Sequence, residues 1–236
     1  MKTELGKAVR TCLQQLSNPA RAKQQQAYMK STTPHYGVMA APLRANLKSV
    51  VKEHPCNTNE DWVLAAQDLW RNAAYREERY AAIELLATPA YQRAWFSTDH
   101  YPMLREMIVS GAWWDYVDNL AANHVFKLLK KHPRETTVLM RGWAREDDLW
   151  LRRTSIICQL KRRKDTDLEL LTYAINGSIA DSNFFARKAI GWALREYSKT
   201  DPDWVVGYIE TNEERLSPLS QREGLKVIRK AQGALR

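Results

Sequence analysis

The sequence predicts an all-α fold, specifically an α-solenoid of HEAT-like antiparallel helix pairs with a basic concave groove. Nearly every segment shows apolar residues at helical spacing, and no window shows the alternation expected of a half-buried strand. Roughly a dozen such helices joined by short turns are typical of stacked helix pairs, whose superhelix is concave along its length. We expect one helical-repeat domain over residues 1–236, with an irregular helical bundle as the alternative.

The expected helices follow one another with short breaks. Asn18 and Asp201 each precede a first-turn proline, Asn59 precedes two acidic residues, and Pro133 follows a basic segment that suits a helix end. In chain order the expected helices are 3–16, 18–30, 43–53, 59–71, 73–87, 101–109, 112–131, 134–144, 147–163, 166–176, 183–198, 202–210 and 218–231.

The charge balance indicates a polyanionic partner. The chain has 36 Lys and Arg against 27 Asp and Glu, giving a formal net charge of +9. Such a balance favours binding to nucleic acid or to an acidic membrane surface. No apolar run approaches the ~18 residues of a spanning helix, and the N-terminus lacks the apolar segment of a signal peptide. We therefore expect a cytoplasmic protein, and a monomer, since no coiled-coil seam demands association.

The motifs of common cofactor sites are missing from the sequence. Cys12, Cys56 and Cys158 are far apart and form no Cys-x-x-Cys pair, and no His-Glu-x-x-His spacing occurs. There is no Gly-x-Gly-x-x-Gly and no phosphate-binding loop either. No cofactor and no metal ion are therefore expected.

Trp114 and Asp118 are the first candidate pair for chemistry. They are four residues apart in the expected helix 112–131 and so lie on one face. An indole attracts cations through its quadrupole and a carboxylate attracts them by Coulomb's law, so together they suit a cationic ligand. The alternative is a tryptophan at the edge of the core beside a solvated carboxylate.

Arg153 is a second candidate, because helix periodicity places it on or beside an apolar face in line with Trp150. A guanidinium there needs a partner. That partner is either a phosphate, which its planar fork suits, or one of the nearby acids Glu146, Asp147 and Asp148. The pattern alone leaves both roles open.

A basic stripe follows in the expected helix 183–198, where Lys188, Trp192, Arg195 and Lys199 recur at steps of four, three and four. An exposed indole within such a stripe indicates nucleic-acid contact more than core packing, although anionic lipids and acidic proteins also bind such patches. Tyr28, at the end of an early helix, is by itself only a helix-end aromatic.

In combination, these motifs resemble the HEAT-repeat alkylpurine DNA glycosylases, the AlkD family, from about residue 20 to about residue 230. The resemblance rests on Tyr-Met-Lys at 28–30, Trp-Trp-Asp-x-Val-Asp at 113–118, Trp-Leu-x-Arg at 150–153, Phe-Phe-x-x-Lys-Ala-Ile-Gly-Trp-x-Leu-Arg-Glu-Tyr at 184–197 and Leu-Ser-x-Arg-Glu at 219–223. One departure is the Ala40-Ala41-Pro42 segment, where the family places a threonine before the proline. That departure puts part of the DNA affinity in doubt.

The resemblance implies a DNA repair enzyme that hydrolyses the N-glycosidic bond of cationic N3- and N7-alkylated purines in duplex DNA, without flipping the base. It implies that Asp118 is the catalytic carboxylate and that Trp114 and Trp192 face the sugar and base. It further implies DNA contacts from Arg153 and Tyr28, to which the basic stripe adds Lys188, Arg195 and Lys199. The alternative is a non-catalytic HEAT-repeat module that binds DNA structures or a protein partner. Retention of the four residues Asp118, Trp114, Trp192 and Arg153 favours the enzyme.

Overall fold

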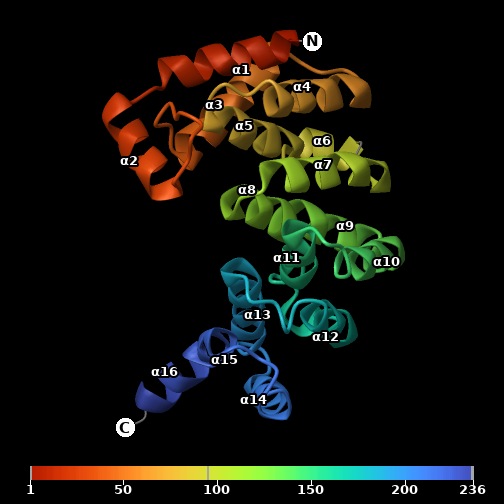
Figure 1. Cartoon of the computed structure of the whole chain (residues 1–236). Coiled ribbons are helices and arrows are strands. Elements are labelled where there is room, and N and C mark those ends of the chain that lie inside the picture. Colours follow the sequence, from red (N-terminus) through yellow and green to blue (C-terminus); the bar gives the residue numbers. More distant parts are fainter. Residues whose placement is uncertain (1, 95, 235–236) are drawn as a thin grey trace. The chain divides into compact units, whose positions relative to one another are not determined.

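The structure, a computed structural model, describes residues 2–94 and 96–234, with side chains described as far as residue 231. Every regular element in these residues is a helix, which confirms the expected all-α class (Figure 1). The chain divides into two compact units, Met1–Ser97 and Thr98–Arg236. The single domain expected over residues 1–236 stays a prediction.

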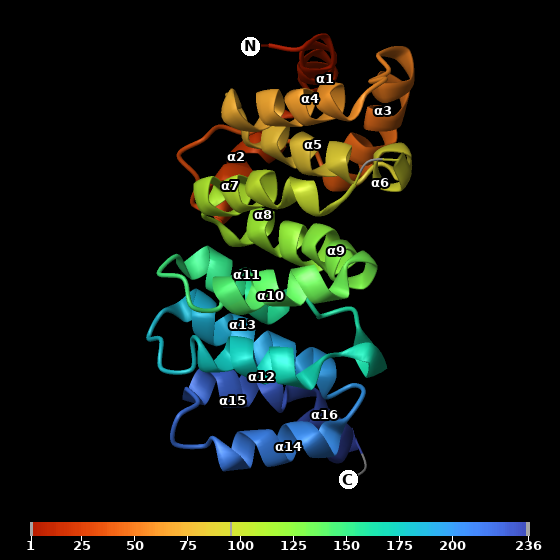
Figure 2. The ribbon, with the colours of Figure 1, turned by 90° about the vertical axis from the view of Figure 1, so that its right-hand side faces the viewer.

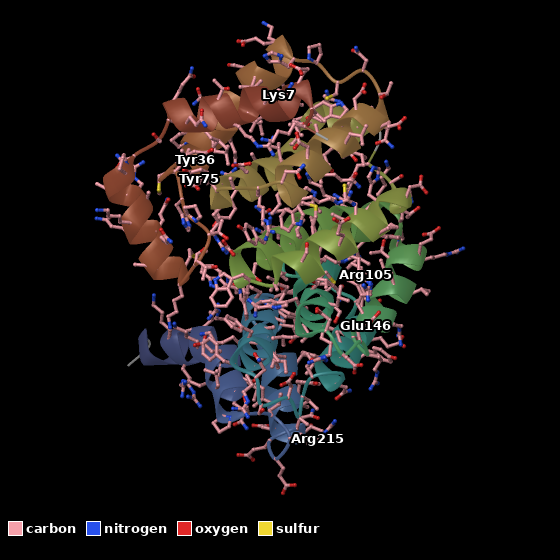
Figure 3. The ribbon with its side chains drawn as sticks, turned by 45° about the horizontal axis from the view of Figure 1, so that its top comes forward. Lys7, Tyr36, Tyr75, Arg105, Glu146 and Arg215 are labelled. Atoms are coloured by element: carbon pink, nitrogen blue, oxygen red, sulfur yellow. The ribbon has the colours of Figure 1, made fainter. Side chains whose placement is uncertain are left out.

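The first unit is built from α1 (Glu4–Gln15), α2 (Pro19–Met29), α3 (Ala40–Glu53), α4 (Asn59–Arg71), α5 (Arg76–Leu86) and α6 (Pro89–Ala94). Its central feature is the carboxylate of Glu77, which is 1% exposed. This carboxylate accepts hydrogen bonds from the backbone N–H groups of Tyr36, Gly37 and Val38 at 2.9, 2.8 and 3.0 Å. Glu77 thereby fixes the segment that leads into α3. The ring of Tyr36 stacks on that of Tyr75, with 3.9 Å between centroids (Figure 3).

The second unit contains α7 (Tyr101–Gly111), α8 (Trp114–Asn119), α9 (Phe126–Lys131), α10 (Pro133–Trp143), α11 (Leu149–Ile157), α12 (Leu168–Asn176), α13 (Phe184–Tyr197), α14 (Pro202–Thr211), α15 (Pro218–Gly224) and α16 (Lys226–Ala234). Figure 2 shows α10, α12 and α14 as one layer, with α11, α13 and α15 packed behind it. Successive helices thus alternate between two layers, as expected of stacked helix pairs. An apolar core that includes Ile156, Ile190 and Val205 lies among these helices.

The structure corrects several expected boundaries. The helix expected over 112–131 contains a π-helical segment, Leu120–Val125, between α8 and α9. The helix expected over 147–163 ends at Ile157, the one expected over 218–231 is divided at Leu225, and the six-residue α6 was not expected. Periodicity cannot register a π-turn, because one extra residue only shifts the phase of an otherwise helical pattern.

The capping expectations are confirmed for two helices and wrong for a third. Asn18 accepts a hydrogen bond from the N–H of Arg21, and Asp201 accepts one from the N–H of Trp204, each at 2.9 Å. Asn59 does not cap α4. Thr58 does so instead, in a reciprocal capping box with Asp61. Thr58 is the N-cap because Asp61, three positions later, completes a capping box with it.

Gly191 is required by the close packing of α13 on α15. A Cβ at this position would lie 2.6 Å from the Cβ of Glu223 and 3.0 Å from the carbonyl oxygen of Ser220. We expect Gly191→Ala to lower the free energy of unfolding by about 1–3 kcal/mol through overpacking. Gly207→Ala is the matched control, because a Cβ there meets nothing within 4 Å and alanine favours the helix. Urea unfolding of both variants tests this, and equal stability of the two would contradict it.

Candidate functional site

Asp118 and Arg153, singled out separately in the sequence, form one ion pair between α8 and α11. Nε of Arg153 donates to Oδ1 of Asp118 and Nη2 donates to Oδ2, each at 2.8 Å. The side chain of Arg153 is 5% exposed and that of Asp118 is 17% exposed. The contact is therefore a bidentate pair, nearly buried on the arginine side, with part of the carboxylate still reachable by solvent.

Arg153 also binds a third helix. Its Nη1 donates to the backbone carbonyl of Phe185, in the first turn of α13, at 2.7 Å. One guanidinium thus connects α8, α11 and α13, and each of its three nitrogens has a partner within the second unit. Of the two roles that the sequence left open, the structure shows the ion pair, and the phosphate contact of Arg153 stays a prediction.

Arg153 pairs with Asp118 and not with the acids that the sequence offered as partners, so that alternative is wrong. Glu146 pairs with Arg105, from α7, at 3.3 Å, as Figure 3 allows the reader to follow. Asp148 caps α11 by accepting from the N–H groups of Trp150 and Leu151 at 2.9 Å each. Asp118 lies 35 residues before Arg153, so local sequence could not reveal it.

An aromatic cluster packs at the start of the same three helices. The ring of Phe185 lies 5.5 Å from that of Trp113, the N-cap residue of α8, and 5.0 Å from that of Trp150 in α11. Such pairs contribute packing beyond their buried area. The cluster therefore fixes the helix ends whose neighbouring residues, Asp118 and Arg153, carry the charges.

The buried position of Asp118 affects its ionisation. Burial raises the pKa of the Asp118 carboxyl above its ordinary value, whereas the hydrogen bonds and charge of Arg153 act in the opposite direction. The charge of Asp115 adds to the raising effect. Asp118 thus depends on Arg153 to hold its negative charge in a largely dry environment.

The two tryptophans of the predicted site lie on the helices that Arg153 connects. Trp114 begins α8, one turn before Asp118, and is half-buried. Trp192 lies in α13, two turns after Phe185, and is also half-buried because it packs against the apolar core of this unit. The sequence favoured an exposed indole within the basic stripe, whereas the structure shows a half-buried one.

The basic stripe on α13 is an ion-pair network in the structure. Lys188 Nζ lies 3.0 Å from Oε1 of Glu223, on α15, and Arg195 pairs with the other oxygen of the same carboxylate. Lys199 pairs with Glu196 one turn earlier. Two carboxylates thus offset much of the charge of three cations. The hydrogen bond from Lys188 holds the pKa of Glu223 below its ordinary value, so Glu223 stays charged.

Tyr28 belongs to the first unit, where it lies near the C-terminal end of α2 and is 75% exposed. The residues of the Ala40-Ala41-Pro42 segment form the first turn of α3. Met39 occupies the N-cap position of α3 without a side-chain capping bond. The N–H groups of Ala40 and Ala41 thus begin the helix with no capping side chain.

Two contributors to the site were missed by sequence reasoning. The carbonyl of Phe185 carries no sequence signal, because every residue has one. Glu223 stands at the end of the Leu-Ser-x-Arg-Glu motif, but its role depends on the packing of α15 against α13. Both depend on contacts distant in sequence.

Metal ligands do not gather at this site. Within the described residues, no group of three or more His, Cys, Asp or Glu side chains could hold a metal ion. Among the helices described, none is long and apolar enough to cross a membrane.

Comparison with known proteins places the chain in a family. A sequence model of the family described as "DNA alkylation repair enzyme" matches residues 9–228, which extend through both units. A solved structure of a predicted DNA alkylation repair enzyme from Enterococcus faecalis is similar, with 33% sequence identity and a TM-score of 0.77. The match covers 89% of this chain and 95% of that one. No curated protein matches the chain. The chain belongs to the DNA alkylation repair enzyme family.

Proposed function

We propose that the protein is a DNA glycosylase that hydrolyses the N-glycosidic bond of cationic N3- and N7-alkylated purines in duplex DNA. Family membership supports a role in DNA repair. The observation that carries the finer proposal is the Asp118 carboxylate, largely buried yet held as an anion by Arg153, with Trp114 on the same helix. Stability alone does not require a buried ion pair, since a protein with apolar residues of similar volume in its place is often as stable.

The chemistry requires few groups. An alkylated purine already carries positive charge, so it can leave without a proton from a general acid. As the bond breaks, the deoxyribose develops oxocarbenium character, as in glycoside hydrolysis. The enzyme must then stabilise a cation and direct a water molecule to it.

Asp118 supplies both functions in the proposal. Each carboxylate oxygen has two lone pairs, and Arg153 occupies one on each oxygen. The remaining lone pairs, on the 17% exposed side, can accept a hydrogen bond from the attacking water. At ~4 Å and an effective dielectric near 20, a carboxylate–cation pair is worth about 4 kcal/mol, or roughly a thousandfold in rate. The neighbouring guanidinium offsets part of this attraction.

Trp114 and Trp192 provide the other part of the cation site. An indole face near a cation contributes on the order of 1–2 kcal/mol, more when the pair is shielded from water. Half-buried indoles are partly held by packing, so little ordering cost is added on binding. In this proposal they pack against the deoxyribose, and selectivity comes from the charge of the lesion, without base flipping.

Phosphate contacts from Lys188, Arg195 and Lys199 of the second unit would hold the duplex. Arg153, which is 5% exposed and bound through all three nitrogens, would act by holding Asp118. Tyr28 of the first unit stays a separate predicted DNA contact. Because Glu223 offsets Lys188 and Arg195, we expect Glu223→Gln to raise affinity for duplex DNA severalfold and to steepen its salt dependence. Anisotropy titrations over a range of salt concentrations measure both. Glu169→Gln is the control, since Glu169 pairs with Arg141 in the layer of α10, α12 and α14. An unchanged salt slope in Glu223→Gln would contradict phosphate binding by this stripe.

The proposed activity is tested by comparing cationic and neutral lesions. Duplexes that carry 7-methylguanine or 3-methyladenine should release the free base in the presence of the protein, whereas a uracil duplex of the same sequence should not. The reason is that uracil is neutral and leaves poorly without proton donation. Efficient release of uracil would refute the cation argument. Tight, salt-sensitive DNA binding without release of any base would support the non-catalytic alternative.

A further inference from the structure

Six basic residues gather at one edge of the second unit, apart from the proposed site. Lys130 and Lys131 end α9, and residues 161–164 form the connection between α11 and α12. Arg162 Nη1 contacts the carbonyl of Leu129, in the last turn of α9, which brings the two segments together. Figure 2 shows both segments along the same side of this unit. We call this surface the basic edge: Lys130, Lys131, Lys161, Arg162, Arg163 and Lys164.

The connection is held in one conformation by a buried side chain. Gln159 is 4% exposed, and its side-chain amide donates to the carbonyl of Asp167 while its oxygen accepts from the N–H of Asp167, each at 2.9 Å. Arg162 Nε adds a hydrogen bond to the carbonyl of Asp165 at 2.8 Å. The cations of this loop are therefore presented on a preorganised frame, which lowers the ordering cost of binding.

Backbone conformation at Arg163 is a second, independent sign of function. Arg163 has φ of 53°, in the left-handed region, where glycine or asparagine is common and a long side chain costs about 1–2 kcal/mol. Non-glycine residues in this region cluster at ligand-binding sites. The side chains of Lys161, Arg163 and Lys164 are exposed. The strained conformation at Arg163 therefore places cations in solvent and does not support a buried contact.

Within the loop of the basic edge, residues 161–167, four cations stand beside two carboxylates. The same loop contains Asp165 and Asp167, and Asp167 is occupied as the N-cap of α12, where it accepts from the N–H of Leu170 at 2.9 Å. The excess of cations over carboxylates in this loop produces a field that concentrates a polyanion. Basic side chains at helix ends also complement helix dipoles, but one or two charges suffice for that.

We propose that the basic edge binds backbone phosphates of the duplex that flanks the lesion. This rests on the proposal that the lesion lies at Asp118. Asp118 and Lys131 lie along one nearly continuous helical stretch, α8 to α9, so they are roughly 20 Å apart at ~1.5 Å per residue. A duplex lying along this stretch would reach the edge roughly six base pairs from the lesion. Lys161 approaches from the other segment, since it donates to Asn123 in the π-helical turn just after Asp118.

The test measures binding of duplexes that carry a single central 7-methylguanine by fluorescence anisotropy over a range of salt concentrations. The triple variant Lys161→Gln, Arg163→Gln, Lys164→Gln removes three exposed cations of the basic edge. For a duplex of about 24 base pairs, the salt slope should fall by about 2–3, since each lost phosphate contact reduces it by ~0.9. For a duplex of about 8 base pairs centred on the lesion position, which is too short to reach the edge, the two proteins should bind alike.

The matched control removes three exposed cations elsewhere in the same unit, Arg105→Gln, Arg145→Gln and Arg215→Gln. It should leave the salt slope for the long duplex close to that of the wild type. Equal losses in both triple variants, or an unchanged slope in the basic-edge variant, would overturn the proposal. Lost binding to anionic vesicles with unchanged binding to the long duplex would also overturn it, in favour of a membrane contact.

Arg163→Gly separates function from folding. Glycine relieves the left-handed strain, so stability should not fall, whereas the salt slope for the long duplex should decrease by about 1. A loss of stability with an unchanged slope would assign Arg163 a structural role and contradict the proposal. These binding tests do not depend on base release. If the protein binds DNA through this edge but releases no base, the glycosylase proposal is refuted and the basic-edge proposal stands.

Discussion

Asp118→Asn should lower the release of 7-methylguanine and 3-methyladenine by a hundredfold or more. The substitution keeps the size of the side chain but removes the charge that is proposed to stabilise the sugar cation. At an effective dielectric near 20 that charge is worth about 4 kcal/mol, and partial neutralisation by Arg153 reduces the expected loss from roughly a thousandfold to hundreds. Single-turnover release at saturating protein measures the effect on chemistry apart from binding.

The same substitution disturbs the ion pair, so folding must be controlled. The carbonyl oxygen of an asparagine can accept a hydrogen bond from one nitrogen of Arg153. Its NH₂ group, however, would face the other Arg153 N–H group, donor against donor, which leaves the guanidinium poorly partnered. The double variant Asp118→Asn, Arg153→Met removes both charges and should recover part of the lost stability without recovering release. Near-normal release by either variant, with normal DNA binding, would exclude Asp118 as the catalytic carboxylate.

Arg153→Met should lower both stability and release. Removing one partner of a buried pair leaves the Asp118 carboxylate uncompensated, at a cost of about 3–5 kcal/mol in the free energy of unfolding. The hydrogen bond to the carbonyl of Phe185 is lost as well, so α13 and the Trp192 that it carries are held less firmly. Release should fall in the same direction as for Asp118→Asn, because Asp118 is no longer positioned.

The pH profile separates this positioning role from a purely structural one. The active form of Asp118 in the proposal is the carboxylate, so release falls as pH decreases through the pKa of Asp118. Burial raises that pKa and Arg153 opposes the shift, so removing Arg153 raises the pKa further. The acidic limb of the release profile should therefore move to higher pH in Arg153→Met. A profile that keeps its wild-type shape at reduced amplitude would mean that Arg153 does not control the charge of Asp118.

The fold class could be predicted from the sequence because helical periodicity and caps are local signals. Asn18 and Asp201 cap the helices expected of them, each ahead of a proline. The π-helical turn at Leu120–Val125 and the break at Leu225 could not be predicted, since both preserve an approximately helical apolar pattern.

The residues of the candidate site could be predicted from the sequence, but the contacts between them could not. The sequence singled out Asp118 as half of a cation site with Trp114, and Arg153 as a guanidinium beside an apolar face that needs a partner. The ion pair between Asp118 and Arg153 depends on the packing of α8 against α11, which brings together positions 35 residues apart. The pairing of Lys188 with Glu223 depends in the same way on α13 meeting α15, so the sequence showed a basic stripe where the structure has an ion-pair network.

The most direct test of the proposed function is release of 7-methylguanine from a duplex with a single lesion, measured against the spontaneous rate. Alkylated purines leave DNA slowly on their own, so the protein-free duplex is the necessary reference. We predict release well above the spontaneous rate with wild-type protein, and release near it with Asp118→Asn at equal DNA occupancy. Release by the wild type no faster than from the protein-free duplex, with the duplex fully bound, would contradict the proposed glycosylase activity.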